Sequence, residues 1–257
     1  MAEDLVRVEL ENRVLRITMN RPEKKNALSL AMYEAMTEAL ERATADPEIR
    51  VVTLSGVDKC FTSGNDVLDF IDEPPADEGS PVIRFLHALH KLPKPLIGSV
   101  NGIAVGIGTT VLLHCDLAYA ADSAIFQMPF VNLGLCPEAG SSFLFPQFLG
   151  LRKASELILL GEKFGAQVAL EAGLVNRVVP DAELAAVTLE AAHKLAAQPP
   201  ASVRISKALL KSGNAAAVEH AMREEGKHFA ERLTSGEATE AFTAFLERRK
   251  PDFSSFK

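Results

Sequence analysis

One carboxylate stands out among the residues whose types allow chemistry. Glu138 lies in the segment GLCPEAGSSFLF (134–145), where its neighbours are mostly apolar or small. A carboxylate in such company is either a residue of a helix N-terminus that faces water or a buried base with a raised pKa. The sequence leaves both interpretations open. The second would supply a general base for proton transfer.

Two glycine-containing segments carry main-chain amides that a ligand can use. The stretch CFTSGND (60–66) comes shortly after the buried run VVTLSG (51–56), and its residue types favour a turn. It is either a tight turn or a loop that presents its backbone N–H groups. The segment GIGTTV (106–111) allows three interpretations: a partial dinucleotide fingerprint, close helix–strand packing, or an anion or oxyanion site at the first helical amide, Ile107.

Other types of site are disfavoured by residue type and spacing. The six histidines include no pair of the HExxH kind, and no GxSxG elbow activates Ser63, Ser141 or Ser142 as a nucleophile. The three cysteines are scattered and include no CxxC pair, which argues against a disulfide framework or a cysteine zinc site. We expect no metal ligands and a reducing compartment.

The elements that must position these residues alternate between strands and helices. The segment LVRVELENRVLRITMN (5–20) predicts a hairpin turning at 11–13, and Ser29 predicts the N-cap of a helix with an apolar stripe that includes Tyr33. Asp66 is expected to cap a short helix over 67–71, and DEPPADEGSP (72–81) to form a mobile loop. Alternation continues to Pro180, and the chain is then almost entirely helical. The fold class is α/β with a helical C-terminal region.

Composition and charge disfavour some classes of binding partner. The chain of 257 residues has a formal net charge of -7, which argues against a nucleic-acid partner or an acidic membrane surface. The acidic N-terminus is unlike a signal peptide, and no apolar run reaches the length of a membrane span. We therefore expect a cytoplasmic protein.

Several segments together resemble the crotonase superfamily, the enoyl-CoA hydratase/isomerase family. The resemblance covers essentially the whole chain and is carried by NRPEKKNAL, FTSGND, PKPLIGSVNGIAVGIG, HCDLAYA, FQMPFVNLGLCPEAGSS and AGLVNRVVP. The motifs SGND and PFVNLGLCPEAGSS, with the FP that follows, are most similar to peroxisomal-type Δ3,Δ2-enoyl-CoA isomerases. The resemblance implies a spiral of β-β-α repeats over residues 1–196 and a helical trimerisation region over 197–257. It also implies a homotrimer or homohexamer.

The resemblance assigns roles to individual residues. The backbone N–H groups of Asn65 and Ile107 would form the oxyanion hole for a thioester oxygen. Glu138 would be the catalytic base. Substrate contacts would come from Lys24, Ala27, Ser63, Gly64, Asp66, Val67 and Phe130, and Arg21, Lys24 and Lys25 would supply positive charge for the phosphates of CoA.

The sequence departs from the hydratases of that family at two positions. Thr110 and Phe130 stand where the two water-handling glutamates would lie, whereas the isomerase-type glutamate is present as Glu138. The resemblance therefore implies an isomerase that moves a 3-enoyl-CoA double bond to trans-2 in fatty acid β-oxidation, with no cofactor because CoA enters as part of the substrate. Alternatives are another crotonase-type acyl-CoA enzyme (a hydratase, a dienoyl-CoA isomerase or a hydrolase), a non-catalytic acyl-CoA-binding member, or an RNA-binding member. The acidic charge disfavours the last of these.

Overall fold

The computed structural model describes residues 5–67, 69 and 79–256. Its strands form two sheets. In spatial order, the six-stranded sheet contains β1 (Val6–Glu11), β2 (Val14–Met19), β3 (Val51–Gly56), β5 (Leu96–Val100), β7 (Leu117–Ala121) and β10 (Arg177–Val179). The four-stranded sheet contains β4 (Cys60–Thr62), β6 (Ile103–Val105), β8 (Ile125–Gln127) and β9 (Phe164–Gly165).

Successive turns of the chain build both sheets at once. The pairs β3–β4, β5–β6 and β7–β8 each give their first strand to the six-stranded sheet and their second to the four-stranded sheet. Neighbouring turns pair in parallel, as in β3 with β5 and β4 with β6. This repeated step is a spiral of β-β-α turns, so the predicted fold class is confirmed.

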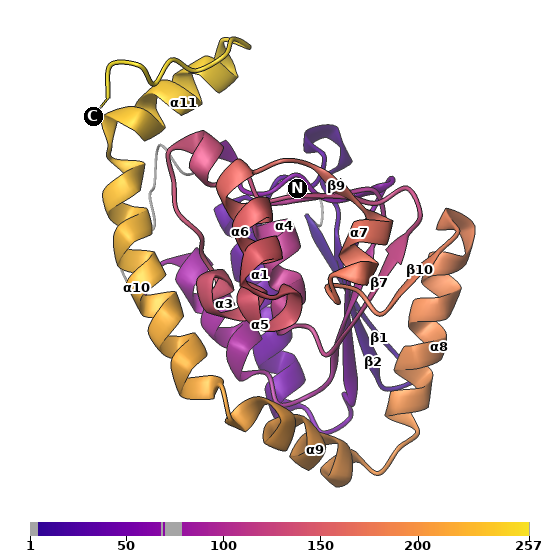
Figure 1. Cartoon of the computed structure of the whole chain (residues 1–257). Coiled ribbons are helices and arrows are strands. Elements are labelled where there is room, and N and C mark those ends of the chain that lie inside the picture. The colour runs from indigo at the N-terminus through magenta and orange to yellow at the C-terminus, as the bar shows by residue number, and fades with distance from the viewer. Residues whose placement is uncertain (1–4, 68, 70–78, 257) are drawn as a thin grey trace.

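The helices surround the two sheets (Figure 1). They are α1 (Leu30–Ala45), α3 (Pro81–Lys91), α4 (Ile107–Thr110), α5 (Ser141–Leu149), α6 (Leu151–Leu160), α7 (Ala166–Glu171), α8 (Leu184–Ala196), α9 (Pro200–Ser212), α10 (Ala215–Leu233) and α11 (Gly236–Leu246). Short 3-10 turns are η1 (Pro22–Lys24), η2 (Val111–His114), η3 (Val131–Leu133) and η4 (Asp181–Glu183).

Local sequence signals correctly place the first elements. The β1–β2 hairpin turns at Asn12 and Arg13, both with positive φ, as a two-residue turn that matches strand twist requires. Ser29 caps α1 by accepting a hydrogen bond from the N–H of Met32 at 3.3 Å. Tyr33 of α1 is fully buried and meets Phe85 of α3 edge-on, with ring centroids 5.3 Å apart.

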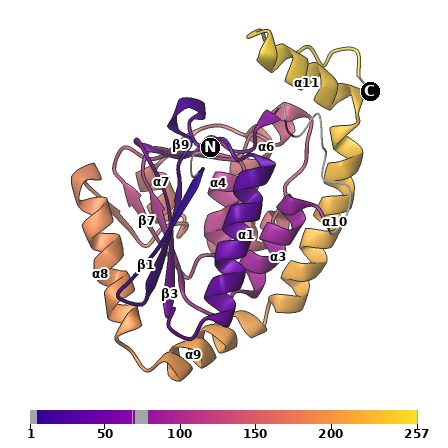
Figure 2. The ribbon, with the colours of Figure 1, turned by 180° about the vertical axis from the view of Figure 1, so that it is seen from behind.

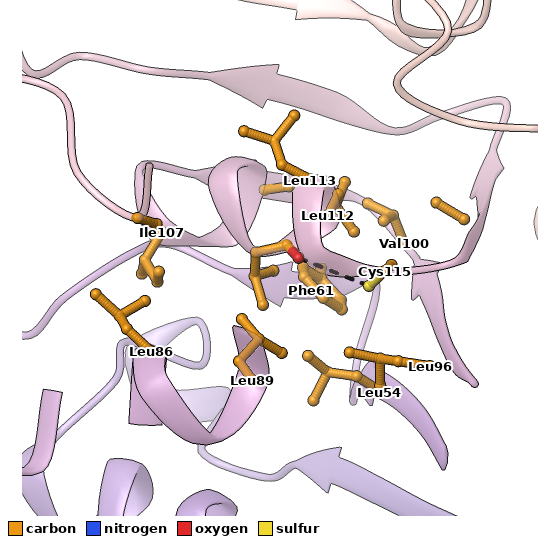
Figure 3. Packing of buried hydrophobic residues seen from close by; sticks show 14 of the residues in the cluster. Leu54, Phe61, Leu86, Leu89, Leu96, Val100, Ile107, Leu112, Leu113 and Cys115 are labelled. Atoms are coloured by element: carbon orange, nitrogen blue, oxygen red, sulfur yellow. Dashed lines mark hydrogen bonds between the residues drawn. The ribbon is translucent and has the colours of Figure 1, made fainter. Parts of the chain in front are cut away.

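The two faces of the six-stranded sheet are covered by different helices. Adjacent residues of one strand alternate between them: Val52 joins the main core with α1 and α3, whereas Val51 packs on the other face beneath α8. The main core continues under α4, where Ile107 points toward Leu86 of α3 (Figure 3). Because α4 is anchored by this side chain, its first backbone amide has a defined position.

The C-terminal helices follow the outside of the molecule. Helices α8 and α10 lie on opposite sides and α9 joins them beneath, while α11 projects beyond α10 (Figures 1 and 2). Lys207 of α9 is 8% exposed and donates to Asp116 at 2.7 Å and to the carbonyl of Lys94 at 2.6 Å. These charge-assisted bonds fix α9 to the core of its own chain.

Two predictions fall largely outside the described residues. They are the short helix over 67–71, of which 67 and 69 are described, and the loop over 72–81, of which 79–81 are described. None of the helices in the described part of the chain is long and apolar enough to cross a membrane.

The C-terminal helices lead to a prediction about assembly. Leu210 of α9 is 86% exposed and Phe245 of α11 is 61% exposed, and apolar surface of this kind marks a protein interface. We expect light scattering to give three or six times the mass of one chain. Leu210→Glu or Phe245→Glu should dissociate the assembly, whereas Ser206→Glu on an exposed position of α9 should not. A single-chain mass for the wild type would contradict the predicted trimer or hexamer.

Candidate active site

Two chain segments leave the four-stranded sheet at the same edge. Strands β4 and β6 are parallel neighbours, and Asn65 follows the first by three residues while Ile107 follows the second by two. Gly64 connects them: a Cβ at this position would lie 3.0 Å from the carbonyl oxygen of Val105, and its φ is +95°. Only glycine adopts this geometry without strain, so the two segments approach closely here.

The Asn65 amide is directed away from its own neighbours. Leu28 donates to the carbonyl of Gly64 at 2.8 Å and accepts from the N–H of Asp66 at 2.9 Å. In this parallel bridge between Leu28 and Asn65, the amide and carbonyl of Asn65 itself must point to the opposite side. The N–H of Asn65 is therefore oriented outward from the 21–28 segment.

The Ile107 amide is the second outward-directed donor. Ile107 is the first residue of α4, so its N–H has no carbonyl partner within that helix. Gly106 precedes it with φ +56° and ψ -118°, a conformation that suits glycine and turns the chain into the helix. A Cβ on Gly108 would lie 2.6 Å from Cγ2 of Thr62 on β4, so GIGTTV also packs closely against a strand, and its first amide, unpaired within α4, is compatible with the oxyanion interpretation.

The segment 21–28 lies beside the Asn65 loop, so the residues predicted to contact substrate are close together. Asn26, fully buried, donates to the carbonyl of Cys60 at 2.7 Å, and its own carbonyl accepts from the Thr62 hydroxyl at 2.6 Å. The N–H of Ser63 donates to the carbonyl of Lys25 at 3.0 Å. These bonds bring Lys24, Ala27, Ser63, Gly64, Asp66 and Val67 into one region. The sequence analysis did not assign this role to Asn26, although it lies within the NRPEKKNAL motif.

Arg21, which is predicted to supply charge for phosphates, has partners within the protein. Its guanidinium donates to Asp66 at 2.7 Å and to the carbonyl of Ala27 at 3.1 Å, and both charged side chains are largely buried. This pair joins the 21–28 segment to the Asn65 loop. Lys24 and Lys25 are exposed and carry positive charge on the outer side of that segment.

Glu138 lies just before α5, in the turn that leads to its N-cap Gly140. It is partly exposed and accepts a hydrogen bond from the hydroxyl of Thr110 at 2.5 Å. Desolvation raises the pKa of Glu138 to about 8, against the opposing effect of the Thr110 bond, and the charge of Glu225 raises it further. The structure favours the buried-base interpretation over a residue of a helix first turn that faces water.

The two positions that hold glutamates in hydratase sequences have different surroundings here. Thr110 is on α4, three residues after Ile107, and is fully buried, so the hydroxyl that binds the Glu138 carboxylate and the candidate amide donor share one short helix. Phe130, 5% exposed, begins η3 and belongs to the main apolar core. The two positions that hold glutamates in hydratase sequences are thus a hydroxyl bound to Glu138 and a buried ring.

Tyr33 is a site residue that sequence reasoning missed. Its hydroxyl donates to Oδ1 of Asn65, which fixes the side chain next to the candidate amide donor. Burial raises the pKa of the Tyr33 phenol and the negative charge of Glu138 raises it further, so the phenol stays protonated and acts as a donor. The sequence did contain a signal for this contact: Tyr33 is the polar-tipped residue of an otherwise apolar helix stripe, and a buried tyrosine hydroxyl usually has a hydrogen-bond partner.

Cys60, Cys136 and His114 are poorly suited to act as a nucleophile or a base. Burial raises the pKa of Cys60 and Cys136 to about 11, which keeps both thiols protonated. Burial lowers the pKa of His114 to about 3, and its Nε2 lies 2.7 Å from the carbonyl of Ala139, so the neutral ring donates there. Among the described residues, no three His, Cys, Asp or Glu side chains are grouped as a metal site requires.

The arrangement combines a weakly acidic carboxyl group with two amide donors. A carboxylate with a pKa near 8 accepts protons from weak carbon acids more readily than an ordinary glutamate does. Two outward-directed N–H groups stabilise negative charge on an oxygen between them. Together they suit proton abstraction next to a carbonyl group.

Comparisons with known proteins agree with this chemistry. The family model described as enoyl-CoA hydratase/isomerase matches residues 9–256. The chain is 36% identical over 248 residues to rat enoyl-CoA delta isomerase 2, covering 94% of this chain but 63% of that protein's length. It is 35% identical over 252 residues to the 1,2-epoxyphenylacetyl-CoA isomerase of Escherichia coli strain K12, covering 95% and 96% of the two chains.

A solved structure supports the same grouping. Pseudomonas aeruginosa OdaA superposes with a TM-score of 0.94 at 48% sequence identity, covering 96% of this chain and 100% of that one. The similarity therefore extends over the spiral and the helices that follow it.

The raised pKa of Glu138 predicts a pH-dependent cost in stability. An unperturbed glutamate loses its proton near pH 4.5, whereas Glu138 in the fold loses it near pH 8. Between these values the unfolded chain binds fewer protons, so the stability of the wild type falls as pH rises through this window. Calorimetry should show Glu138→Gln gaining melting temperature over the wild type between about pH 5 and pH 9. Glu34→Gln, on the exposed side of α1, is the control. Equal pH dependence of Glu138→Gln and the wild type would contradict the assignment.

Proposed function

The chain belongs to the enoyl-CoA hydratase/isomerase family, and within that family we propose that it is a Δ3,Δ2-enoyl-CoA isomerase. Its substrate would be a 3-enoyl-CoA, its product the trans-2-enoyl-CoA, and its setting the β-oxidation of unsaturated acyl chains. CoA enters as part of the substrate, and no further cofactor is proposed. The similarity to the rat and human enoyl-CoA delta isomerase 2 supports this choice, and the chain spans 63% of the length of each.

The proposed reaction is a proton transfer by one carboxylate. Ionised Glu138 removes a proton from the α-carbon of the thioester, which is acidic because the resulting charge moves onto the carbonyl oxygen. The N–H groups of Asn65 and Ile107 stabilise that enolate oxygen. Glu138, now protonated, returns the proton to the γ-carbon, so the double bond moves and the base is restored.

Thr110 has a role in this cycle. Its hydroxyl binds Oε1 of Glu138 and therefore leaves Oε2 as the oxygen that exchanges the proton. A carboxylate held at one oxygen has fewer orientations than a free one, which favours transfer between two carbons of the same substrate.

The observation that carries the proposal is the pairing of Thr110 with Glu138. A hydratase needs a second carboxylate to position water, and at that point this chain has a hydroxyl that is already bound to the first carboxylate. Buried Phe130 at the other position adds an apolar wall. One carboxylate beside two amide donors is sufficient for a 1,3-proton shift and insufficient for two-carboxylate hydration.

Substrate binding is proposed to use the region between the 21–28 segment and the Asn65 loop. Exposed Lys24 and Lys25 would contact the phosphates of CoA, whereas Ala27, Ser63, Gly64, Asp66 and Val67 would line the path of its adenine and pantetheine. The other family reactions (hydration, dienoyl-CoA isomerisation, hydrolysis, or binding without turnover) remain distinguishable by a substrate panel.

Glu138→Gln tests the base. The amide is nearly isosteric but does not accept the α-proton, so isomerisation of a 3-enoyl-CoA should fall by about a thousandfold or more. The dissociation constant for octanoyl-CoA should change little. In the wild type, kcat/KM should rise with pH, reach half of its maximum near pH 8 and level off about one pH unit higher, because the base must be ionised in the free enzyme. Activity of Glu138→Gln near the wild-type level would assign the base elsewhere.

A panel of 2-enoyl-CoA thioesters tests the reaction type. The wild type should hydrate them very poorly, since Thr110 and Phe130 replace the two water-handling glutamates. Hydration at a rate comparable with isomerisation would overturn the isomerase assignment in favour of a hydratase.

Ile107→Pro tests the oxyanion hole. Proline removes the N–H yet is tolerated at the first position of a helix, so the fold should survive while kcat/KM falls by about a hundredfold or more. Ile107→Val keeps the N–H and shortens the side chain by one methyl group, so it should lose far less. Equal losses in the two variants would mean that packing at this position, rather than the amide, matters.

A further inference from the structure

A carboxylate from the C-terminal region reaches the turn that carries Glu138. Glu225 lies in the middle of α10, and its side chain is largely buried, with the residue 7% exposed. Its two oxygens accept from the N–H of Gly140 at 2.6 Å and from the N–H of Ser142 at 2.7 Å. These amides belong to the N-terminus of α5, so Glu225 caps that helix from another element.

Close packing fixes the distance between α10 and this turn. A Cβ on Gly140 would lie 3.1 Å from Cγ1 of Val218 and 3.3 Å from Cγ of Met222, both on α10. Gly140 also has φ +72°. A glycine is therefore required here for two reasons, and α10 lies directly against the backbone that follows Glu138.

The turn adopts a conformation that needs external support. Ala139 has φ +60°, a left-handed conformation that is unfavourable for a residue with a Cβ, and Gly140 continues in the same region. On one side, Nε2 of His114 donates to the carbonyl of Ala139 at 2.7 Å. On the other side Glu225 binds the next amide. The peptide groups immediately after Glu138 are thus held from both sides.

We propose that Glu225 is a positioning residue for the base, acting through the backbone of the 138–140 turn and through its own negative charge. The inference rests on the proposed function, because it assigns Glu225 to the same proton transfer. Its geometric basis is the pair of charge-assisted hydrogen bonds to Gly140 and Ser142. A carboxylate that accepts two main-chain N–H groups holds the turn in a way that a neutral side chain does not.

The charge of Glu225 acts on Glu138 in a defined direction. It raises the pKa of Glu138, although desolvation is the larger cause. The other groups that interact with Glu138 are the Thr110 hydroxyl from α4, the Tyr33 phenol from α1 and the thiol of Cys136, which are neutral, as is His114 from η2. Cys136 is also influenced by Arg232 of α10. Glu225 is the other carboxylate among these groups; burial raises its own pKa, and the hydrogen bonds from Ser142 and Gly140 oppose that shift by favouring the ionised form.

Two substitutions separate the two effects. Glu225→Gln removes the charge and keeps one acceptor oxygen. Glu225→Asp keeps the charge but is one methylene shorter, so it no longer reaches both amides. The matched control is Glu224→Gln, which makes the same change at the neighbouring residue of α10, where the side chain is exposed and pairs with Lys227 at 2.6 Å.

The measurement is the pH profile of 3-enoyl-CoA isomerisation with kcat and KM resolved. Glu225→Gln should move the acid limb of kcat/KM to lower pH, because Glu138 then ionises more easily. Glu225→Asp should leave the limb in place and lower kcat on the plateau by about ten- to a hundredfold, since a small displacement of a catalytic group has an effect of this size. KM and the dissociation constant for octanoyl-CoA should change by less than about threefold in both variants. Glu224→Gln should match the wild type throughout.

Several outcomes would overturn the proposal. If the acid limb of kcat/KM stays at the wild-type pH in Glu225→Gln, Glu225 has no charge effect on Glu138. If the plateau kcat of Glu225→Asp also equals that of the wild type, Glu225 has no positioning role either. A loss of activity equal at every pH, with a matching loss of folded protein by circular dichroism, would show a purely structural role. Where Glu225→Gln does not fold, the plateau of Glu225→Asp still decides whether the two bonds matter to the base.

A second readout keeps this inference separate from the proposed function. The protonated carboxyl band of Glu138, identified by its loss in Glu138→Gln, is titrated by infrared difference spectroscopy without substrate. A lower titration midpoint in Glu225→Gln supports the charge effect even if the wild type fails to isomerise any 3-enoyl-CoA. An unchanged midpoint refutes it even if the isomerase activity is present.

Discussion

The parallel pairing of β4 with β6 is the constraint on which the site depends. Parallel neighbours end at the same edge of a sheet, so the segments that carry Asn65 and Ile107 both begin at that edge. Gly64 then brings the Asn65 loop against Val105, and Gly106 turns the second segment into α4. Because both candidate donors are main-chain amides, their positions follow from strand register and helix start rather than from side-chain identity. The rest of the site has to be built around these two points.

Burying the Glu138 carboxylate costs more free energy than positioning the two amides. Removing an anion from water disfavours its charged form, and the Thr110 hydroxyl offsets only part of that cost, which is why the pKa of Glu138 rises to about 8. A base strong enough to compete for a carbon-bound proton must also be ionised for a useful fraction of the time. Burial with one hydrogen bond gives a compromise between these requirements. A fully solvated glutamate would be ionised more often and would be a weaker base.

The sequence predicts what depends on neighbours in the chain and misses what depends on distant ones. Local residue types predict the hairpin turn, the Ser29 cap and the strand–helix alternation. They also predict the turn within CFTSGND (60–66) and the helix start within GIGTTV (106–111). The structure has each of these features. The Tyr33–Asn65 bond spans 32 residues, Arg21–Asp66 spans 45 and Glu225–Gly140 spans 85. Helical periodicity identifies Tyr33 as buried but not its partner. Glu225 reads as one more charge on a charged helix, and its burial against Gly140 is visible only once α10 is placed.

The helical region beyond residue 196 is bound to the spiral at functionally sensitive points. Lys207 of α9 neutralises Asp116 at the start of β7, and Glu225 of α10 caps the helix that follows Glu138. Each pair buries charge, so breaking either contact would leave an uncompensated ion in the core, a much larger penalty than the loss of exposed contacts. The predicted boundary near residue 196 is thus crossed by buried contacts from both α9 and α10. It follows that an assembly built on α10 would involve the same helix whose Glu225 caps the turn after Glu138.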